Sequence, residues 1–242
     1  MDTVFFLAAN SGRGFYSLYD GFPERRGVFL SIIKGGPGTG KSGFMRRISA
    51  AAKQSGLDTE EIICSGDPDS LDALYIPALG RAWMDGTAPH VREPRAFAAD
   101  AGYEDLGRFC AAPLGKNDAA LAREIDLDYK AVYAQAYRLL SAAAQTADCA
   151  RETPLSCAGA STISELIVDA GEPGFIKRRF MSAVSCKGRV RLVGTLRELC
   201  PRAVMLSDDG LEHAARTAEE NGLSAIVCPQ PLRPDKLDAV LL

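Results

Sequence analysis

The residues with the clearest chemical potential lie in the glycine-rich stretch GGPGTGKSGF, residues 35–44. It matches the pattern G-x-x-x-x-G-K-[ST], in which backbone N–H groups converge on phosphates, a lysine reaches the β- and γ-phosphates, and a hydroxyl ligates Mg²⁺. Lys41 is therefore also a catalytic candidate, and Ser42 a metal ligand. Because no guanine-specific N-K-x-D occurs, the pattern predicts ATP as the nucleotide, held by Gly35, Gly36, Pro37, Gly38, Thr39, Gly40, Lys41, Ser42 and Gly43.

Two further candidates are Asp67 and Asp69, which follow an apolar strand predicted at 62–64. Ligands of open α/β sheets bind beyond the carboxyl ends of the strands, where a carboxylate can act as the general base of a phosphotransferase. The alternative is structural. In that interpretation the two residues shape an Asp-Pro turn and cap a helix that begins near Leu71.

Asp85 and His90 form a third candidate group. The apolar residues 82–84 lead directly into Asp85, as in a strand that ends in a Walker-B-like acid orienting the water shell of a metal ion. A plain Asp-Gly turn explains Asp85 equally well. His90 is a candidate for contact with phosphate or substrate, or else an ordinary loop residue. Since no Glu stands beside Asp85, we expect hydrolysis to be slow or to need a partner.

The elements around the loop follow the order that a phosphate site requires. Residues 27–34 are rich in Val, Ile, Leu and Phe and predict a buried parallel strand, and the segment after the loop predicts a helix that ends at Gly56. Residues 117–152 contain no Gly or Pro and carry apolar side chains at three- and four-residue steps, which indicates a long amphipathic helix. It either covers the sheet, bridges two units, or acts as a lid or partner-binding arm. VDAGEPGF at 168–175 is the predicted linker.

An internal repeat accompanies these elements. DPDSLDALYI at 67–76 recurs as RPDKLDAVLL at 233–242. The match extends backward through QSGLDTEEIIC and ENGLSAIVC, through MRRISAAAKQSG and LEHAARTAEENG, and through FLAANSGRG at 6–14 and FMSAVSCKG at 180–188. The second copy lacks a counterpart of residues 37–44, so it has neither the lysine nor the hydroxyl of the loop. We expect its strands to complete one sheet with the first copy or to form a pseudo-symmetric pair with it.

These observations predict an α/β fold with a three-layer, mostly parallel sheet like that of P-loop NTPases. They divide the chain into a nucleotide-binding unit at 1–97, a helical insertion and linker at 98–172, and a degenerate repeat at 173–242. FYSLYD at 15–20, IIKGGPGTGKS, CSGDPDSLDAL and DGTAPHV at 85–91 resemble an uncharacterised group of bacterial P-loop ATPases built as two tandem halves. By this resemblance we expect the second half to be degenerate and truncated here. The resemblance implies ATP binding at 35–42 and a special role for 85–90.

The amino-acid composition argues against several classes of binding partner. The net charge is −3, and Lys and Arg are scattered, which disfavours a nucleic-acid partner. The longest apolar runs are too short to span a membrane, and Asp2 stands where a signal peptide carries positive charge, so we expect a cytoplasmic protein. Seven cysteines without a C-x-x-C pair, and only two histidines, predict reduced and mainly buried cysteines rather than disulfides or a zinc site.

The predicted function is Mg²⁺-dependent ATP hydrolysis in an unidentified process, coupled to a conformational change or to an unidentified protein partner. Two alternatives remain open. One is a kinase for a small-molecule acceptor with Asp67 or Asp69 as its base, and the other is a regulatory nucleotide sensor with little turnover.

Overall fold

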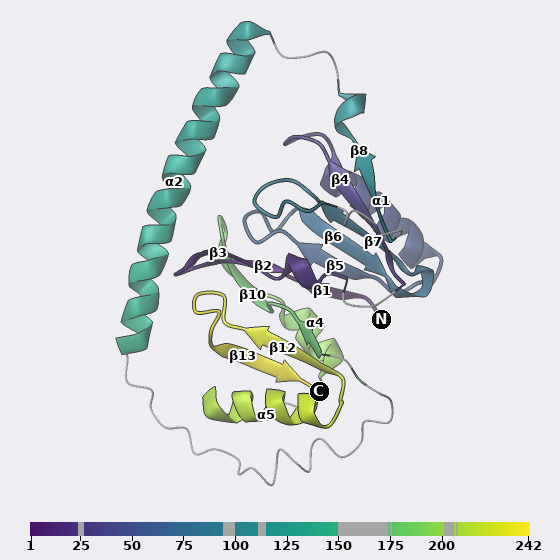
Figure 1. The fold of residues 1–242 in the computed structure, drawn as a ribbon, viewed down its shortest axis with the longest axis vertical. Coiled ribbons are helices and arrows are strands. Elements are labelled where there is room, and N and C mark those ends of the chain that lie inside the picture. The colour runs from purple at the N-terminus through teal and green to yellow at the C-terminus, as the bar shows by residue number, and fades with distance from the viewer. Residues whose placement is uncertain are drawn as a thin grey trace.

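The computed structural model describes residues 1–23, 27–93, 100–110, 115–149, 174, 176–200, 206 and 208–242, without the side chains of residues 116 and 149. It is an α/β structure with a mostly parallel central sheet (Figure 1). The predicted linker at 168–175 falls outside the described residues except for Gly174. No described helix has a segment long and apolar enough to cross a membrane.

The central sheet has six strands in the order β1-β5-β6-β7-β4-β8, and all but β6 run in one direction. The strands are β1 (Thr3–Phe5), β4 (Phe29–Lys34), β5 (Glu60–Ile63), β6 (Leu71–Ile76), β7 (Arg81–Asp85) and β8 (Ala101–Asp105). β8 pairs with β4, so the first sheet extends beyond residue 97, into the segment expected to hold the helical insertion. Short 3-10 turns occur at η1 (Tyr19–Gly21), η2 (Pro77–Leu79) and η3 (Gly107–Phe109).

The helix expected near Leu71 does not form, because these residues make strand β6. All six of its residues are buried, and it pairs antiparallel with β5 on one side and β7 on the other. A continuous apolar run of this length suits a strand enclosed on both faces as well as it suits a helix, and periodicity alone cannot separate the two.

The two faces of the central sheet are covered differently. Helix α1 (Lys41–Gln54) packs on one face, where Ile33, Met45 and Leu74 belong to one apolar cluster. The cluster on the other face combines residues such as Ile32 and Met84 with Met181, Cys228 and Leu241 from the C-terminal part of the chain. The C-terminal unit therefore takes the place of a second helical layer.

The C-terminal unit forms a sheet of its own, in the order β13-β12-β9, so it does not extend the central sheet. It contains β9 (Ile176–Arg178), α4 (Val193–Leu199), α5 (Asp208–Glu220), β12 (Ala225–Pro229) and β13 (Leu237–Leu241). Two antiparallel hairpins lie between the sheets, and they consist of β2 (Ala8–Ser11) with β3 (Gly14–Ser17) and of β10 (Ser182–Ser185) with β11 (Gly188–Arg191).

Corresponding segments of the two units make corresponding pairings. β5 pairs with β1 and β6 as β12 pairs with β9 and β13, and each antiparallel pair carries a register shift near its turn. Ile62 lies opposite Ala73, and Cys228 lies opposite Ala239. The counterpart of Cys228 is thus Ile62, and the shared cysteine of EEIIC and AIVC is not a structural match.

The hairpins cross between the units in a nearly two-fold arrangement. The amides of Phe6 and Phe180 each donate to the carbonyl of the other, at 3.0 and 2.9 Å. The Gly12 amide donates to the Leu232 carbonyl, and the Cys186 amide donates to the Gly66 carbonyl. Each hairpin therefore binds the turn of the other unit's strand pair.

Helix α2 (Lys116–Cys149) extends along the side of both units (Figure 1). Its second half contacts them: Tyr137 donates a hydrogen bond to Asn10, and Asp148 pairs with Arg233. The large apolar side chains at its three- and four-residue steps are exposed, namely Leu121, Ile125, Tyr129, Val132 and Leu139, and so is Leu127 beside them. The helix bridges the units, as one alternative predicted, and does not cover the sheet.

The cysteines differ from expectation in their burial. Five have described side chains, all with free thiols, and of these only Cys228 is buried, whereas Cys110 and Cys186 are exposed. Burial raises the pKa of the Cys64 thiol to about 12, with the Asp72 carboxylate adding to the effect, so this thiol stays protonated.

Candidate functional site

The glycine-rich loop lies at the carboxyl edge of the central sheet, between the end of β4 and the start of α1. Gly35, Gly38 and Gly40 have φ angles of +145°, +79° and +87°, which side chains of L-residues disfavour. A Cβ on Gly35 would also lie 2.5 Å from Thr39 Oγ1, while the Thr39 hydroxyl donates to the Gly36 carbonyl at 2.9 Å. The glycines thus permit a tight turn whose path ends at the N-terminus of a helix, where the first-turn amides have no intrahelical acceptor.

Lys41 and Asp85 are brought together from separate elements. The Lys41 ammonium donates to the Gly35 and Gly36 carbonyls at 2.7 and 3.0 Å and lies 3.5 Å from the Asp85 carboxylate. Both side chains are largely shielded from solvent. Asp85 ends β7, the direct neighbour of β4, and this placement explains why the acid reaches the loop.

Ser42 lies in the first turn of α1 and accepts a hydrogen bond from the Leu71 amide at 2.9 Å. Among the described residues, no group of three or more His, Cys, Asp or Glu side chains could hold a metal ion alone. A site for Mg²⁺ bound together with phosphates needs fewer protein ligands, because this ion is commonly held by one or two protein oxygens together with phosphate and water. Near the loop, Ser42 in the first turn of α1 and Asp85, 3.5 Å from Lys41, are side chains with oxygen atoms of this kind.

His90 is buried and is part of a polar network with Asp72 and Tyr19. Its Nδ1 donates to the Asp85 carbonyl at 3.0 Å, and its Nε2 lies 3.3 Å from the Asp72 carboxylate, which also accepts from the Tyr19 hydroxyl. Burial alone would lower the pKa of His90. The hydrogen bond to Asp72 and the charges of Asp72 and Asp85 outweigh it, so this pKa is raised above 6.5.

Asp85 is further held by its own turn. Its carboxylate accepts from the Thr87 amide at 2.9 Å and from the Thr87 hydroxyl at 2.6 Å. With His90 on the Asp85 carbonyl, both the main chain and the side chain of this acid are positioned from the DGTAPH segment. Asp85 therefore forms an Asp-Gly turn and also places its carboxylate beside the loop, so the two interpretations of this residue are compatible.

Asp67 and Asp69 lie in the turn between β5 and β6 and have partners there. Asp67 accepts from the Asp69 amide and from the Ser70 hydroxyl, and Asp69 pairs with Lys187 of the second unit. These contacts are those of a turn. The helix that these residues were expected to cap is strand β6.

Two residues of the network were not identified as candidates from the sequence. Asp72 is buried inside β6, and Tyr19 is buried in η1, where burial and the Asp72 charge raise its pKa well above 10. An acidic residue inside the apolar run LDALYI is the signal that could have identified Asp72, because a charge in a buried strand requires partners. The sequence gives no comparable signal for Tyr19.

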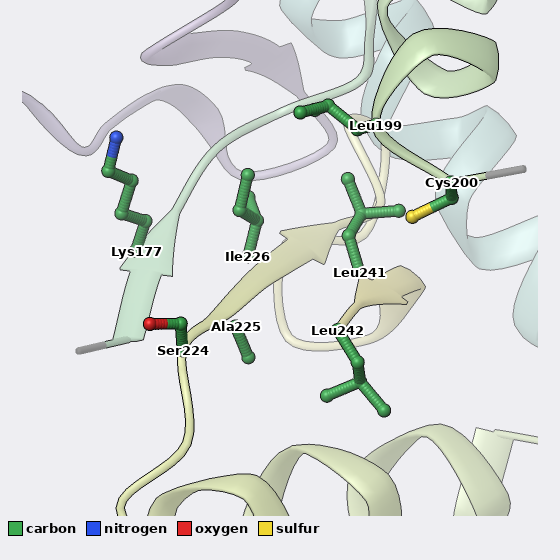
Figure 2. A pocket seen from close by; sticks show the side chains of 8 residues that line it. All are labelled: Lys177, Leu199, Cys200, Ser224, Ala225, Ile226, Leu241 and Leu242. Carbon is green, nitrogen blue, oxygen red and sulfur yellow. The ribbon is translucent and has the colours of Figure 1, made fainter. Parts of the chain in front are cut away.

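A cavity of about 240 Å³ lies elsewhere, in the C-terminal unit (Figure 2). Its walls are mostly apolar, and the Lys177 ammonium at its edge is bonded to Glu60 at 2.7 Å. The residues around it are Lys177, Leu199, Cys200, Ser224, Ala225, Ile226, Leu241 and Leu242. None of the loop residues lines it, so the cavity does not form part of the candidate site.

Comparison of the chain with models of protein families, with curated proteins and with solved structures found no match.

Proposed function

We propose that this protein binds ATP with Mg²⁺ at residues 35–42 and hydrolyses it, as a P-loop protein whose C-terminal unit is a degenerate copy without the loop. The observation that carries the proposal is the juxtaposition of Lys41 and Asp85, 3.5 Å apart, at a glycine turn that leads into a helix N-terminus. Convergent amides and a helix dipole favour a bound anion.

Each residue has a role in this proposal. Lys41 would exchange contacts with the loop carbonyls for contacts with the β- and γ-phosphates, and the Ser42 hydroxyl and the Asp85 carboxylate would hold the metal ion. The ion would supply charge neutralisation at the phosphates. His90 and Thr87 would act on Asp85 as positioning residues.

A nucleotide sensor with little turnover is a second candidate, supported by the partners of the acidic groups. Asp67, Asp69 and Asp85 each have contacts within turns or with cations, and His90 points into a buried network. A group that activates the attacking water would then come from a partner or from rearrangement. The kinase alternative is weaker, since Asp67 and Asp69 are already engaged.

The deciding experiment is isothermal titration of the protein with ATP and a non-hydrolysable analogue in the presence of Mg²⁺, beside Lys41→Ala. Lys53→Ala is the matched control, because Lys53 lies near the C-terminal end of the same helix, away from the loop, where it pairs with Glu61. We expect the wild type and Lys53→Ala to bind both nucleotides and Lys41→Ala to bind neither. Absence of binding by folded wild-type protein would refute the proposal.

Turnover separates the two candidates. Phosphate release that requires Mg²⁺ and is abolished in Lys41→Ala supports hydrolysis. Binding without phosphate release supports the sensor, and ADP production that appears only with an added acceptor and is lost in Asp67→Asn supports the kinase.

A further inference from the structure

Three parallel strands carry their carboxyl ends to the loop side by side. β7 ends at Asp85, β4 leads into the loop, and β8 leads into η3. The Leu106 amide donates to the Lys34 carbonyl at 2.9 Å, and the Gly107 amide nitrogen lies 3.3 Å from the position of a Cβ on Gly35. The turn η3 is therefore packed against the start of the loop.

The positions of Lys41 and Asp85 indicate in which direction a nucleotide bound at the loop would extend across these strands. Lys41 and Asp85, the groups proposed for the terminal phosphates and the metal ion, lie toward β7. If the terminal phosphates lie at this pair, the base at the other end of the nucleotide extends away from β7. The flank opposite β7 is formed by β8 and η3.

An exposed aromatic side chain lies on that flank. Phe109 is 71% exposed, the highest value among the exposed large hydrophobic side chains of the described residues. The Arg108 guanidinium lies over its ring, 4.6 Å from the ring centre. Aromatic rings and guanidinium planes are the surfaces on which nucleobases stack in proteins.

We propose that Arg108 and Phe109 form a stacking platform for the base of the nucleotide whose phosphates occupy residues 35–42. The platform rests on the proposed function and adds to it a preference for nucleotides over inorganic polyphosphates. Asp105 supports its position, because the Asp105 carboxylate accepts from the Gly107 amide at 2.8 Å at the start of the turn.

The test compares Mg²⁺-dependent titrations of ATP with those of inorganic tripolyphosphate, which has the phosphates without a base. We expect Phe109→Ala to weaken ATP binding about tenfold and to change tripolyphosphate binding less than about twofold, since stacking acts on the base alone. Phe109→Trp restores ATP binding. The control is Tyr103→Ala, which removes an exposed aromatic side chain within β8, before the carboxyl end of the strand. We expect it to leave both affinities unchanged.

The outcomes separate this inference from the proposed function. If the wild type binds both ligands and Phe109→Ala binds ATP as tightly as the wild type, the platform is refuted and the loop site stands. If the folded Phe109→Ala variant weakens both ligands equally, Phe109 acts on the loop and not on a base, which also refutes the platform. Binding of neither ligand by the wild type overturns both proposals.

Discussion

At the scale of single residues, the loop depends on backbone conformations that glycine alone adopts without strain. Gly35 combines a φ of +145° with a close approach to Thr39, so a side chain would meet both an unfavourable φ and a steric clash. Gly43 is different, because it lies in helix α1 and the nearest atom to an added Cβ is the Arg47 side chain at 3.8 Å.

Gly35→Ala tests this dependence. We expect its ATP affinity to fall at least about tenfold and its unfolding free energy to fall by about 1–3 kcal/mol, the usual cost of such backbone strain. Gly43→Ala should instead stabilise the protein by about 0.5–1 kcal/mol, because alanine favours the helical conformation. Titration calorimetry and urea denaturation measure the two effects. Unchanged ATP affinity in Gly35→Ala would show that the conformation of the loop is not needed for binding.

At the scale of elements, α2 depends on a close approach to the first hairpin. A Cβ on Gly12 would lie 2.5 Å from the Ala144 Cβ and 3.3 Å from the carbonyl oxygens of Leu140 and Leu232. The second half of α2 can therefore pack this closely against the hairpin only because residue 12 has no side chain. The exposed apolar residues of its first half have no equivalent support.

Gly12→Ala should therefore loosen α2 without unfolding the sheets. Hydrogen exchange followed by mass spectrometry should show faster exchange of residues 133–147 in the variant, with amides of the central sheet unchanged. Ala144→Gly in the same chain should restore part of the protection, because it removes the atom closest to the new methyl group. Equal exchange in the wild type and Gly12→Ala would contradict the close packing.

At the scale of the whole molecule, the units are joined by a shared apolar core and by a buried ion pair. Glu60 of the first unit accepts from Arg179, which is fully buried, at 2.6 and 2.8 Å, and also from Lys177. Burial alone would raise the pKa of Glu60. The Arg179 and Lys177 charges outweigh it, so this pKa is lowered below 4.5.

A lowered folded-state pKa means that the ionised Glu60 stabilises the protein above about pH 4.5, and that this contribution is lost as the pH falls through the folded-state value. Glu60→Gln should lower the unfolding free energy at pH 7 by about 3 kcal/mol, because it leaves the buried charge of Arg179 without its carboxylate partner while the cost of removing that charge from water remains. The difference from the wild type should shrink at pH 3. Urea denaturation at both values provides the measurement.

Arg13→Gln is the control for this prediction, because its exposed pair with Asp235 also joins the units. An exposed pair contributes about 0–1 kcal/mol, so this variant should stay close to the wild type. A Glu60→Gln variant as stable as Arg13→Gln at pH 7 would show that the buried pair does not hold the units together.

Features that depend only on neighbouring residues could be predicted from the amino-acid sequence. The strand, glycine turn and helix at 29–54 could be predicted because turn conformation and apolar spacing are local properties. Features that depend on distant segments could not be read in this way: Leu71 begins a strand because β6 pairs with β5 and β7, and His90 meets Asp72 because β6 lies beside β7, with Ala73 opposite Met84. The two units have separate sheets because their hairpins and shared core join them face to face, and such long-range packing leaves no mark in local periodicity.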